Sequence, residues 1–282
     1  MGAFLLTAAA LLALLLWAVN TGSLHVTPAQ LLRGLFVEYD PNVATVYDLR
    51  FPRIFIALFG GAATAVAGVL LQAVMKNPLA DPGIIGISSG ASLAAVLVTA
   101  FFPALYFFTP LFAFLGGMLA FALVYSLSWK GGLSPLRIIL VGVAVNAMFT
   151  GLMSAFNSGT GSNYSGVASI VNANITMKTW DDFQTLLLYV VIGLIASVFV
   201  MGQCNLLALE DKTARSLGVN VTRSRIVISV IAVLLASIST AVIGPISFLS
   251  PILQDCWWGA IIRCWYRIPS CWERSPCCWR TP

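Results

Sequence analysis

The chain has 282 residues, of which 59% are hydrophobic and only 9% are charged, and its mean hydropathy is +0.94. Soluble domains carry about 25% charged residues, so this composition excludes a soluble enzyme or binding module and predicts a protein embedded in membrane lipid. The net charge of +5 comes from scattered basic residues. We interpret it as a signal of membrane topology and expect no nucleic-acid partner.

Apolar stretches predict an all-α, polytopic bundle of seven membrane helices, because about 20 apolar residues in a helix span the hydrocarbon core. The predicted helices cover about residues 3–20, 54–75, 84–102, 110–128, 137–156, 184–204 and 226–244. No basic leader precedes the first helix, so we interpret it as a membrane span rather than a cleaved signal peptide.

One unit near the amino terminus organises the rest. Arg50 and Arg53 flank Pro52, the 22 residues 54–75 are uncharged, and a polar turn begins at Lys76. A helix of that length reaches about 33 Å, enough to cross a bilayer core of about 30 Å. The spacing therefore places the two arginines at one membrane face and Lys76 at the other.

Basic residues in the loops favour a cytoplasmic amino terminus. In that orientation the inner side carries Lys76, Lys130, Arg137, Lys212, Arg215, Arg223 and Arg225. The outer side carries Arg33, Arg50, Arg53 and Lys178. The excess of basic residues on the inner side matches the positive-inside rule. Three of the outer residues crowd the first loop, which suggests a local use for positive charge.

Small residues predict close helix packing. Gly60, Thr64 and Gly68 recur every four residues on one helix, and Gly86 and Gly90 open the next. Such faces let membrane helices approach closely. We favour packing within one bundle over a dimer seam for the first set.

The residues 86–90 also match the G-x-S-x-G pattern of serine hydrolases, with Ser88 or Ser89 as nucleophile. That pattern requires a strand-to-helix turn and a base, and the only histidine is His25 in the first loop. We therefore favour packing, and an intramembrane serine hydrolase stays as an alternative. Cysteine spacing predicts no metal site, and no cofactor is expected. No nucleotide-binding P-loop is present, so energy must come from a partner.

Two charged features are open to interpretation. Arg50 and Arg53 could anchor a helix at the headgroups or dock an acidic partner, and composition alone favours anchoring. Residues 205–225 predict two short amphipathic helices that end near Gly218. They fit a docking element for a cytoplasmic protein at least as well as an ordinary interfacial helix.

At this point the residues resemble a known family. The stretch LRFPR, followed by GGAATAVAGVLLQAVMKNPLADPGIIGISSGAS, is similar to permease subunits of type II ABC importers for iron–siderophores, haem and cobalamin. Three further stretches agree, SPLRIILVGVAVN, LEDKTARSLGVNVTRSR and AVIGPISFL, so the similarity covers about residues 1 to 250. The stretch ITMKTWDD, residues 175–182, is similar to haem and siderophore members.

The resemblance implies a non-enzymatic subunit of the bacterial inner membrane, with ten helices, that forms a homodimer or a heterodimer with a related permease. Two cytoplasmic ABC ATPases would bind below, an extracytoplasmic substrate-binding protein would dock above, and a metal chelate would cross by alternating access. Arg50 and Arg53 would pair with the binding protein, which reverses the preference for anchoring. The ATPase-coupling residues would be Glu210, Asp211, Arg215, Leu217 and Gly218. The pathway residues would be Asn146 and Met153, on the helix 137–156.

The carboxyl end departs from the family, which continues for three more helices. We expect a permease domain at 1–254 and an aberrant, unstructured tail at 255–282 that holds five of the six cysteines. Displacing the reading frame near 254–256 would turn the Cys-Trp and Cys-Cys boundaries of the tail into leucine codons and the boundary Trp257-Trp258 into a valine codon, so we hypothesise a frameshift. A genuine divergent tail is the alternative. The loss of helices eight to ten would impair transport, and a non-transporting membrane scaffold is therefore a third hypothesis.

Overall fold

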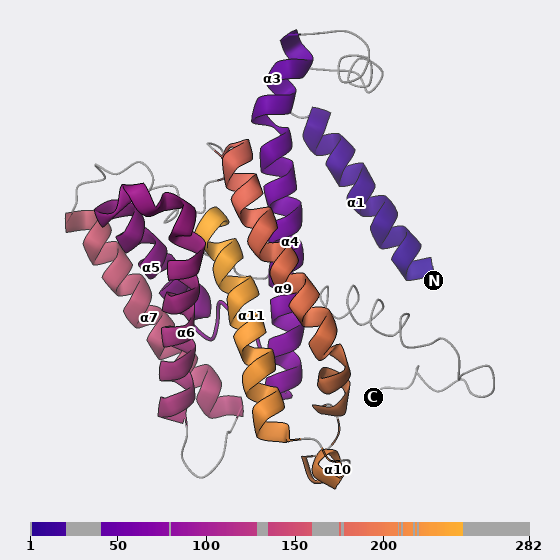
Figure 1. Cartoon of the computed structure of the whole chain (residues 1–282), viewed down its shortest axis with the longest axis vertical. Coiled ribbons are helices and arrows are strands. Elements are labelled where there is room, and N and C mark those ends of the chain that lie inside the picture. The colour runs from indigo at the N-terminus through magenta and orange to yellow at the C-terminus, as the bar shows by residue number, and fades with distance from the viewer. Residues whose placement is uncertain are drawn as a thin grey trace.

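The computed structural model of the chain is a bundle of helices (Figure 1). The structure describes residues 2–20, 41–78, 80–128, 135–159, 175, 178–207, 209, 211–216, 218 and 220–244. Within these residues every regular element is a helix and none is a strand. The all-α prediction is therefore confirmed. The tail 255–282 and the first loop, with His25 and Arg33, lie outside the described residues.

The seven predicted helices are all present among the described residues. They are α1 (Gly2–Asn20), α4 (Phe51–Met75), α5 (Ile87–Phe101), α6 (Thr109–Ser128), α7 (Pro135–Gly159), α9 (Trp180–Leu207) and α11 (Val221–Ile243). Three short elements join them: α3 (Pro41–Leu49), the 3-10 helix η1 (Pro103–Phe108) and α10 (Asp211–Ser216). Composition did not predict α3 or η1. The segment 205–225, for which two amphipathic helices were expected, contains the end of α9, the short helix α10 and the first residues of α11.

Five described helical stretches are long and apolar enough to cross a membrane. They are Val43–Met75, Pro103–Ser128, Arg137–Gly159, Trp180–Leu207 and Val221–Ile243. Helix α5 has 15 residues and reaches about 22 Å, which is shorter than the hydrocarbon core. It therefore depends on its neighbours for a complete crossing.

Local chemistry explains where α4 and α5 begin. Helix α4 starts three residues before the predicted span because Pro52 lies in its first turn, where a missing N–H leaves no hydrogen bond unmade. Helix α5 starts three residues later than predicted because Gly86 precedes it with a φ of +85°. A side chain on Gly86 would also place its Cβ 3.2 Å from the backbone nitrogen of Asn146. Only glycine fits that turn without strain.

Helix α11 is the central element. It contacts α4, α5, α6 and α9, and in Figure 1 it stands between the α4–α9 pair and the group formed by α5, α6 and α7. Of its apolar window, 72% is buried, against 28% for α9 and for α7. The bundle is therefore built around the last described helix, not around the helix with the most distinctive sequence.

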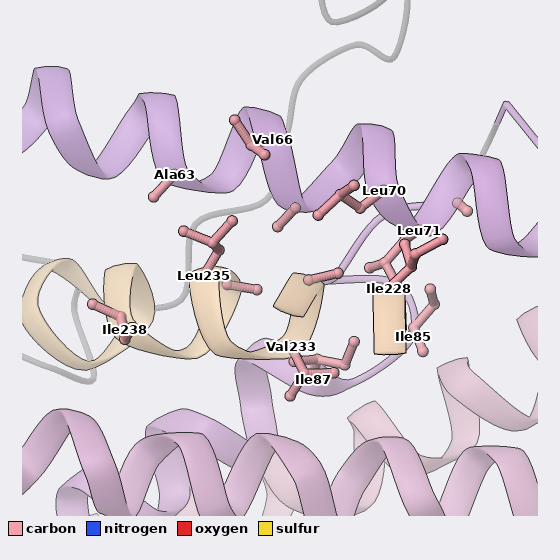
Figure 2. Close-up of a cluster of buried hydrophobic side chains, with 14 of the residues drawn as sticks. Ala63, Val66, Leu70, Leu71, Ile85, Ile87, Ile228, Val233, Leu235 and Ile238 are labelled. Carbon is pink, nitrogen blue, oxygen red and sulfur yellow. The ribbon is translucent and has the colours of Figure 1, made fainter. Parts of the chain in front are cut away.

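The main core lies where α4 meets α11. Figure 2 shows side chains of the two helices pointing toward one another, with Ile85 and Ile87 completing the cluster below them. From α4 come Ala63, Val66, Leu70 and Leu71, and from α11 come Ile228, Val233, Leu235 and Ile238. Among lipid-embedded helices this contact gains from dispersion and close fit, because lipid tails are as apolar as leucine.

Glycines bring α5 and α6 almost into backbone contact. A Cβ on Gly90 would lie 2.8 Å from the carbonyl oxygen of Gly116, and a Cβ on Gly116 would lie 2.5 Å from that of Gly90. Real side chains do not tolerate such distances to backbone atoms. The crossing therefore requires glycine on both helices, which is how small residues hold membrane helices together.

Candidate functional site

The two ends of α4 carry the charged residues that the sequence singled out. Its amino-terminal end, here called the arginine end, holds Arg50 as the residue that caps the helix and Arg53 in its first turn. Arg50 Nη1 donates a hydrogen bond of 2.8 Å to the carbonyl oxygen of Val19, near the end of α1. Arg53 Nε is buried without a hydrogen-bond partner among the described residues. Arg50 thus already has an intramolecular task, holding α1 against α4.

Six aromatic side chains surround the arginine end. The rings of Tyr47 and Trp180 lie 4.9 Å apart, and those of Phe55 and Phe183 lie 5.5 Å apart. The complete aromatic cluster is Tyr47, Phe51, Phe55, Phe59, Trp180 and Phe183. Ring pairs add about 0.5–1.5 kcal/mol each beyond the area that they bury. The cluster therefore holds the start of α9 rigidly against α3 and α4.

A buried ionic group lies beside this cluster. Lys178 Nζ lies 3.7 Å from Asp182 Oδ1, and each residue is only 8% exposed. The Tyr106 hydroxyl of η1 donates to the same carboxylate oxygen, and the Thr179 backbone N–H donates to Oδ2 at 3.0 Å. Asp182 is the third residue of α9, so its bond to Thr179 completes one half of a capping box. The carboxylate therefore joins η1 to the beginning of α9.

The other end of α4, here called the lysine end, meets the predicted coupling segment. Lys76 caps α4 with a φ of +49°, and its Nζ donates a hydrogen bond of 2.6 Å to the carbonyl oxygen of Leu209. Leu207 and Ala214, on either side of Leu209, are 1% and 0% exposed. The segment leading into α10 is thus held by two buried apolar side chains and one lysine.

The predicted coupling residues are described only in part. Asp211 and Arg215 lie on α10, although their side chains are outside the described set, and Glu210 and Leu217 lie outside the described residues altogether. Gly218 has a φ of +82°, which turns the chain from α10 toward α11. Glycine accepts that conformation readily. The sequence predicted that the amphipathic helices end near Gly218, and in the structure the chain makes a left-handed turn there.

The small-residue face of α4 packs inside the chain. A Cβ on Gly60 would lie 2.1 Å from Ile243 Cδ1 of α11, whereas a Cβ on Gly61 would meet nothing within 4 Å. Thr64 is 4% exposed, and its hydroxyl donates to the Gly60 carbonyl at 2.8 Å. Gly68 is also buried. Gly60 therefore faces Ile243 of α11 and Leu186 of α9.

The two predicted pathway residues lie on α7 with different exposure. Met153 is 6% exposed and packs against α5 residues, among them Ala91 and Ala95. Asn146 is half-buried where α7 passes Gly86. The exposed line of α7 is instead formed by Leu140, Val143, Ala144, Ala147, Met148, Gly151, Leu152 and Ala155. The role of Asn146 and Met153 in a pathway stays a prediction.

The serine pattern has no catalytic geometry. Ser88 and Ser89 are 5% and 3% exposed in the first turn of α5, and the Ser89 hydroxyl donates to the Gly86 carbonyl at 2.9 Å. The turn before α5 follows a helix rather than a strand. A nucleophile needs an accessible oxygen and a nearby base. The described residues also hold no group of three or more His, Cys, Asp or Glu side chains that could bind a metal ion.

Sequence reasoning missed the aromatic cluster, the Tyr106–Asp182–Lys178 group and the Lys76–Leu209 contact. A signal existed for the first: Phe51, Phe55 and Phe59 recur every four residues on one helix face. The other two join residues that are 76 and 133 positions apart. No periodic pattern in the sequence shows contacts of that separation, although Lys178 and Asp182 on their own are a local i, i+4 pair.

Comparison with known proteins places this geometry in a family. A profile of the FecCD transport family matches residues 10–252. The heme-iron transport system permease protein IsdF of Staphylococcus aureus strain MSSA476 is 36% identical over 233 residues, covering 83% of this chain and 70% of the relative. IsdF of strain NCTC 8325 / PS 47 is also 36% identical, over 234 residues, with 83% and 71% covered.

A solved structure agrees in fold. A metal-chelate type ABC transporter in an inward-facing conformation superimposes with a TM-score of 0.68 and 23% sequence identity, covering 89% of this chain and 78% of that one. The resemblance seen in the sequence is therefore confirmed, and the serine hydrolase alternative receives no support. The length of the matched region and the identity of the relatives together establish that this chain belongs to the FecCD transport family.

Proposed function

We propose that the chain is the permease subunit of an ABC importer that moves a metal chelate, an iron–siderophore or haem rather than cobalamin, into the cytoplasm by alternating access. The observation that carries the proposal is the family match over residues 10–252. The names of the relatives, which are heme-iron permeases, and of the solved transporter support the substrate class. The chain itself performs no covalent chemistry in this proposal, because ATP is hydrolysed by partner subunits.

The arginine end is the proposed docking site for the substrate-binding protein. Arg53 has a buried Nε without a described partner, and the aromatic cluster makes the surface beneath both arginines rigid. A guanidinium on a rigid base binds a carboxylate at low entropic cost. Exposed Tyr47, 43% accessible, lies at the edge of the same surface.

The lysine end is the proposed contact with the two ATPase subunits. Helix α10 lies at the same end of the bundle as the carboxyl end of α4 (Figure 1). This assignment puts the amino terminus and Lys76 in the cytoplasm and the arginine end outside. The positive-inside excess supports that orientation. The orientation is tested with the single variants Tyr47→Cys and Ser216→Cys, which are treated in intact cells with a thiol reagent that cannot cross the membrane. Only the Tyr47→Cys variant should react at its new cysteine.

Assembly as a homodimer or as a heterodimer with a related permease is part of the proposal. The exposed line of α7, which contains small residues such as Ala144, Ala147 and Gly151, supports it because small side chains allow close approach. Lipid covers the remaining apolar surface. Cysteine cross-linking at Ala147 tests the arrangement, and a cross-linked dimer is the expected result.

Transport is tested in proteoliposomes that contain the chain, its ATPase and its binding protein. Once the reading frame beyond residue 254 is restored, we expect uptake of hemin or of a ferric siderophore that requires ATP, and the chain with the tail 255–282 should transport less. The double variant Arg50→Glu and Arg53→Glu should lower the affinity for the binding protein at least tenfold, since two attractive contacts become repulsive. ATPase binding without uptake of any chelate would instead support the scaffold hypothesis. Normal uptake by the double variant would contradict the docking assignment.

The boundary at residue 254 also stays a proposal. The family match ends at residue 252, which supports a permease domain over 1–254 and a tail of different origin over 255–282. We propose a frameshift near 254–256 as its cause and expect impaired transport. The underlying DNA tests this directly: a second frame encoding apolar helices is the expected result, and a polar second frame would contradict it.

A further inference from the structure

The lysine end contains one contact that neither the family nor the comparisons assign. Lys76 lies immediately after α4, and Leu209 lies two residues after α9. Their hydrogen bond of 2.6 Å joins positions that are 133 residues apart. The bond therefore connects α4, the helix that carries the arginine end, with the segment that leads into α10.

The conformation of Lys76 sets it apart from its surroundings. It is the only described non-glycine residue with a positive φ, +49°, in the left-handed region that side chains adopt with strain. Its backbone N–H still bonds to the Gln72 carbonyl and closes the helix. Glycine would close the helix equally well and with less strain. The left-handed closing of α4 therefore does not require a lysine, although the helix dipole favours a cation at this end.

The Leu209 carbonyl is a suitable acceptor for that side chain. Leu209 lies two residues beyond the end of α9, so its carbonyl belongs to no helix and is open to a side-chain donor. Leu209 is 41% exposed, whereas Leu207 and Ala214 on either side are buried in the main core. The two buried apolar residues hold the chain on either side of Leu209. At exposed Leu209 itself, Lys76 makes the contact, through its hydrogen bond to the carbonyl oxygen.

We propose that Lys76 is a positioning residue for ATPase coupling: through its hydrogen bond to the Leu209 carbonyl it sets the place of Leu209, and with it of α10, relative to α4. The inference rests on the proposed function of that segment. Helix α4 is an unbroken 25-residue helix between the arginine end and Lys76. Movement of α4 when the binding protein docks would therefore carry the coupling segment with it.

Hydrogen exchange of the full chain in lipid nanodiscs tests the positioning itself. Lys76→Met and Lys76→Gly should raise amide exchange in residues 208–216 at least threefold, while α11 stays protected. Lys76→Arg, which keeps a cationic donor, should stay within twofold of the wild type. The glycine variant is the decisive control, because it preserves the left-handed end of α4. Exchange at the wild-type rate in Lys76→Gly would overturn the proposal.

ATP hydrolysis in the assembled importer tests the consequence. The ratio of hydrolysis with the binding protein to hydrolysis without it should fall at least threefold in Lys76→Met and Lys76→Gly and recover in Lys76→Arg. An unchanged ratio in both variants would overturn the coupling role. Failure of the wild-type chain to bind the ATPase would overturn the proposed function instead. The exchange experiment would still decide whether Lys76 holds the segment in place.

Discussion

The two ends of α4 are held in different ways. At the arginine end, six aromatic rings and a buried ionic group fix α3, α4, η1 and α9 together. At the lysine end, one exposed hydrogen bond to Leu209 and two buried apolar residues, Leu207 at the end of α9 and Ala214 on α10, hold this part of the chain. The arginine end is stabilised by several contacts that support one another, whereas the lysine end is stabilised by only a few contacts.

This difference matches two mechanical tasks. A docking surface benefits from rigidity, because little entropy is then lost when a partner binds. A coupling element has to move, and moving elements are drawn from the less stable parts of a fold. Each of the following substitutions, from the largest expected effect to the smallest, tests whether stability is concentrated at the arginine end.

Removing the carboxylate of Asp182 should have the largest effect. Asp182→Ala leaves Lys178 buried without its ionic partner and frees the Tyr106 hydroxyl, at a cost of about 3 kcal/mol or more in the free energy of unfolding. Thermal unfolding in detergent, followed by circular dichroism, measures the loss. The exposed neighbour Asp181 is the matched control, and Asp181→Ala should cost about 0.5 kcal/mol. Equal losses would contradict a special role for the buried group.

The aromatic cluster should come next. Phe55 contacts the rings of Phe51, Trp180 and Phe183, so Phe55→Leu keeps an apolar side chain and loses three ring pairs. At the lower end of the range for each pair, the loss is about 1.5–2 kcal/mol. Phe199 is 80% exposed on α9, and Phe199→Leu should be nearly neutral in the same unfolding assay. A neutral result at Phe55 would show that the rings contribute only their buried area.

Gly60 tests the junction between the arginine end and α11. In Gly60→Ala the new methyl group would displace the Ile243 side chain, and this overpacking should cost about 1 kcal/mol. The adjacent Gly61→Ala meets open space and should be neutral or slightly stabilising, because alanine has the higher helix propensity. Denaturation of the two variants side by side measures the difference. A reversed order would place the helix contact on the other face of α4.

The lysine end should show the smallest change in global stability. Lys76→Gly loses a surface hydrogen bond and gains relief of the left-handed strain, so the two effects should cancel to within about 0.5 kcal/mol. The same unfolding assay measures it. A loss as large as that of Asp182→Ala would erase the contrast between the two ends.

Sequence patterns predicted the elements better than their contacts. The seven long helices followed from runs of apolar residues, and the turn at Gly218 followed from the break in an amphipathic pattern. Met153 shows the limit. Its place on α7 followed from the family, but burial against α5 depends on how α7 is rotated, and an apolar helix with weak amphipathicity does not reveal its rotation.

The sequence by itself determined that this chain lies in a membrane, where its spans run and which family it resembles, because hydrocarbon thickness and the need to satisfy every backbone group leave helices of set length as the solution. Only the tertiary structure decided that α11 is the centre, that Asp182 joins η1 to α9 and that Lys76 reaches Leu209. Those contacts join distant positions of the chain through close packing and single hydrogen bonds, and neither leaves a periodic trace in the sequence.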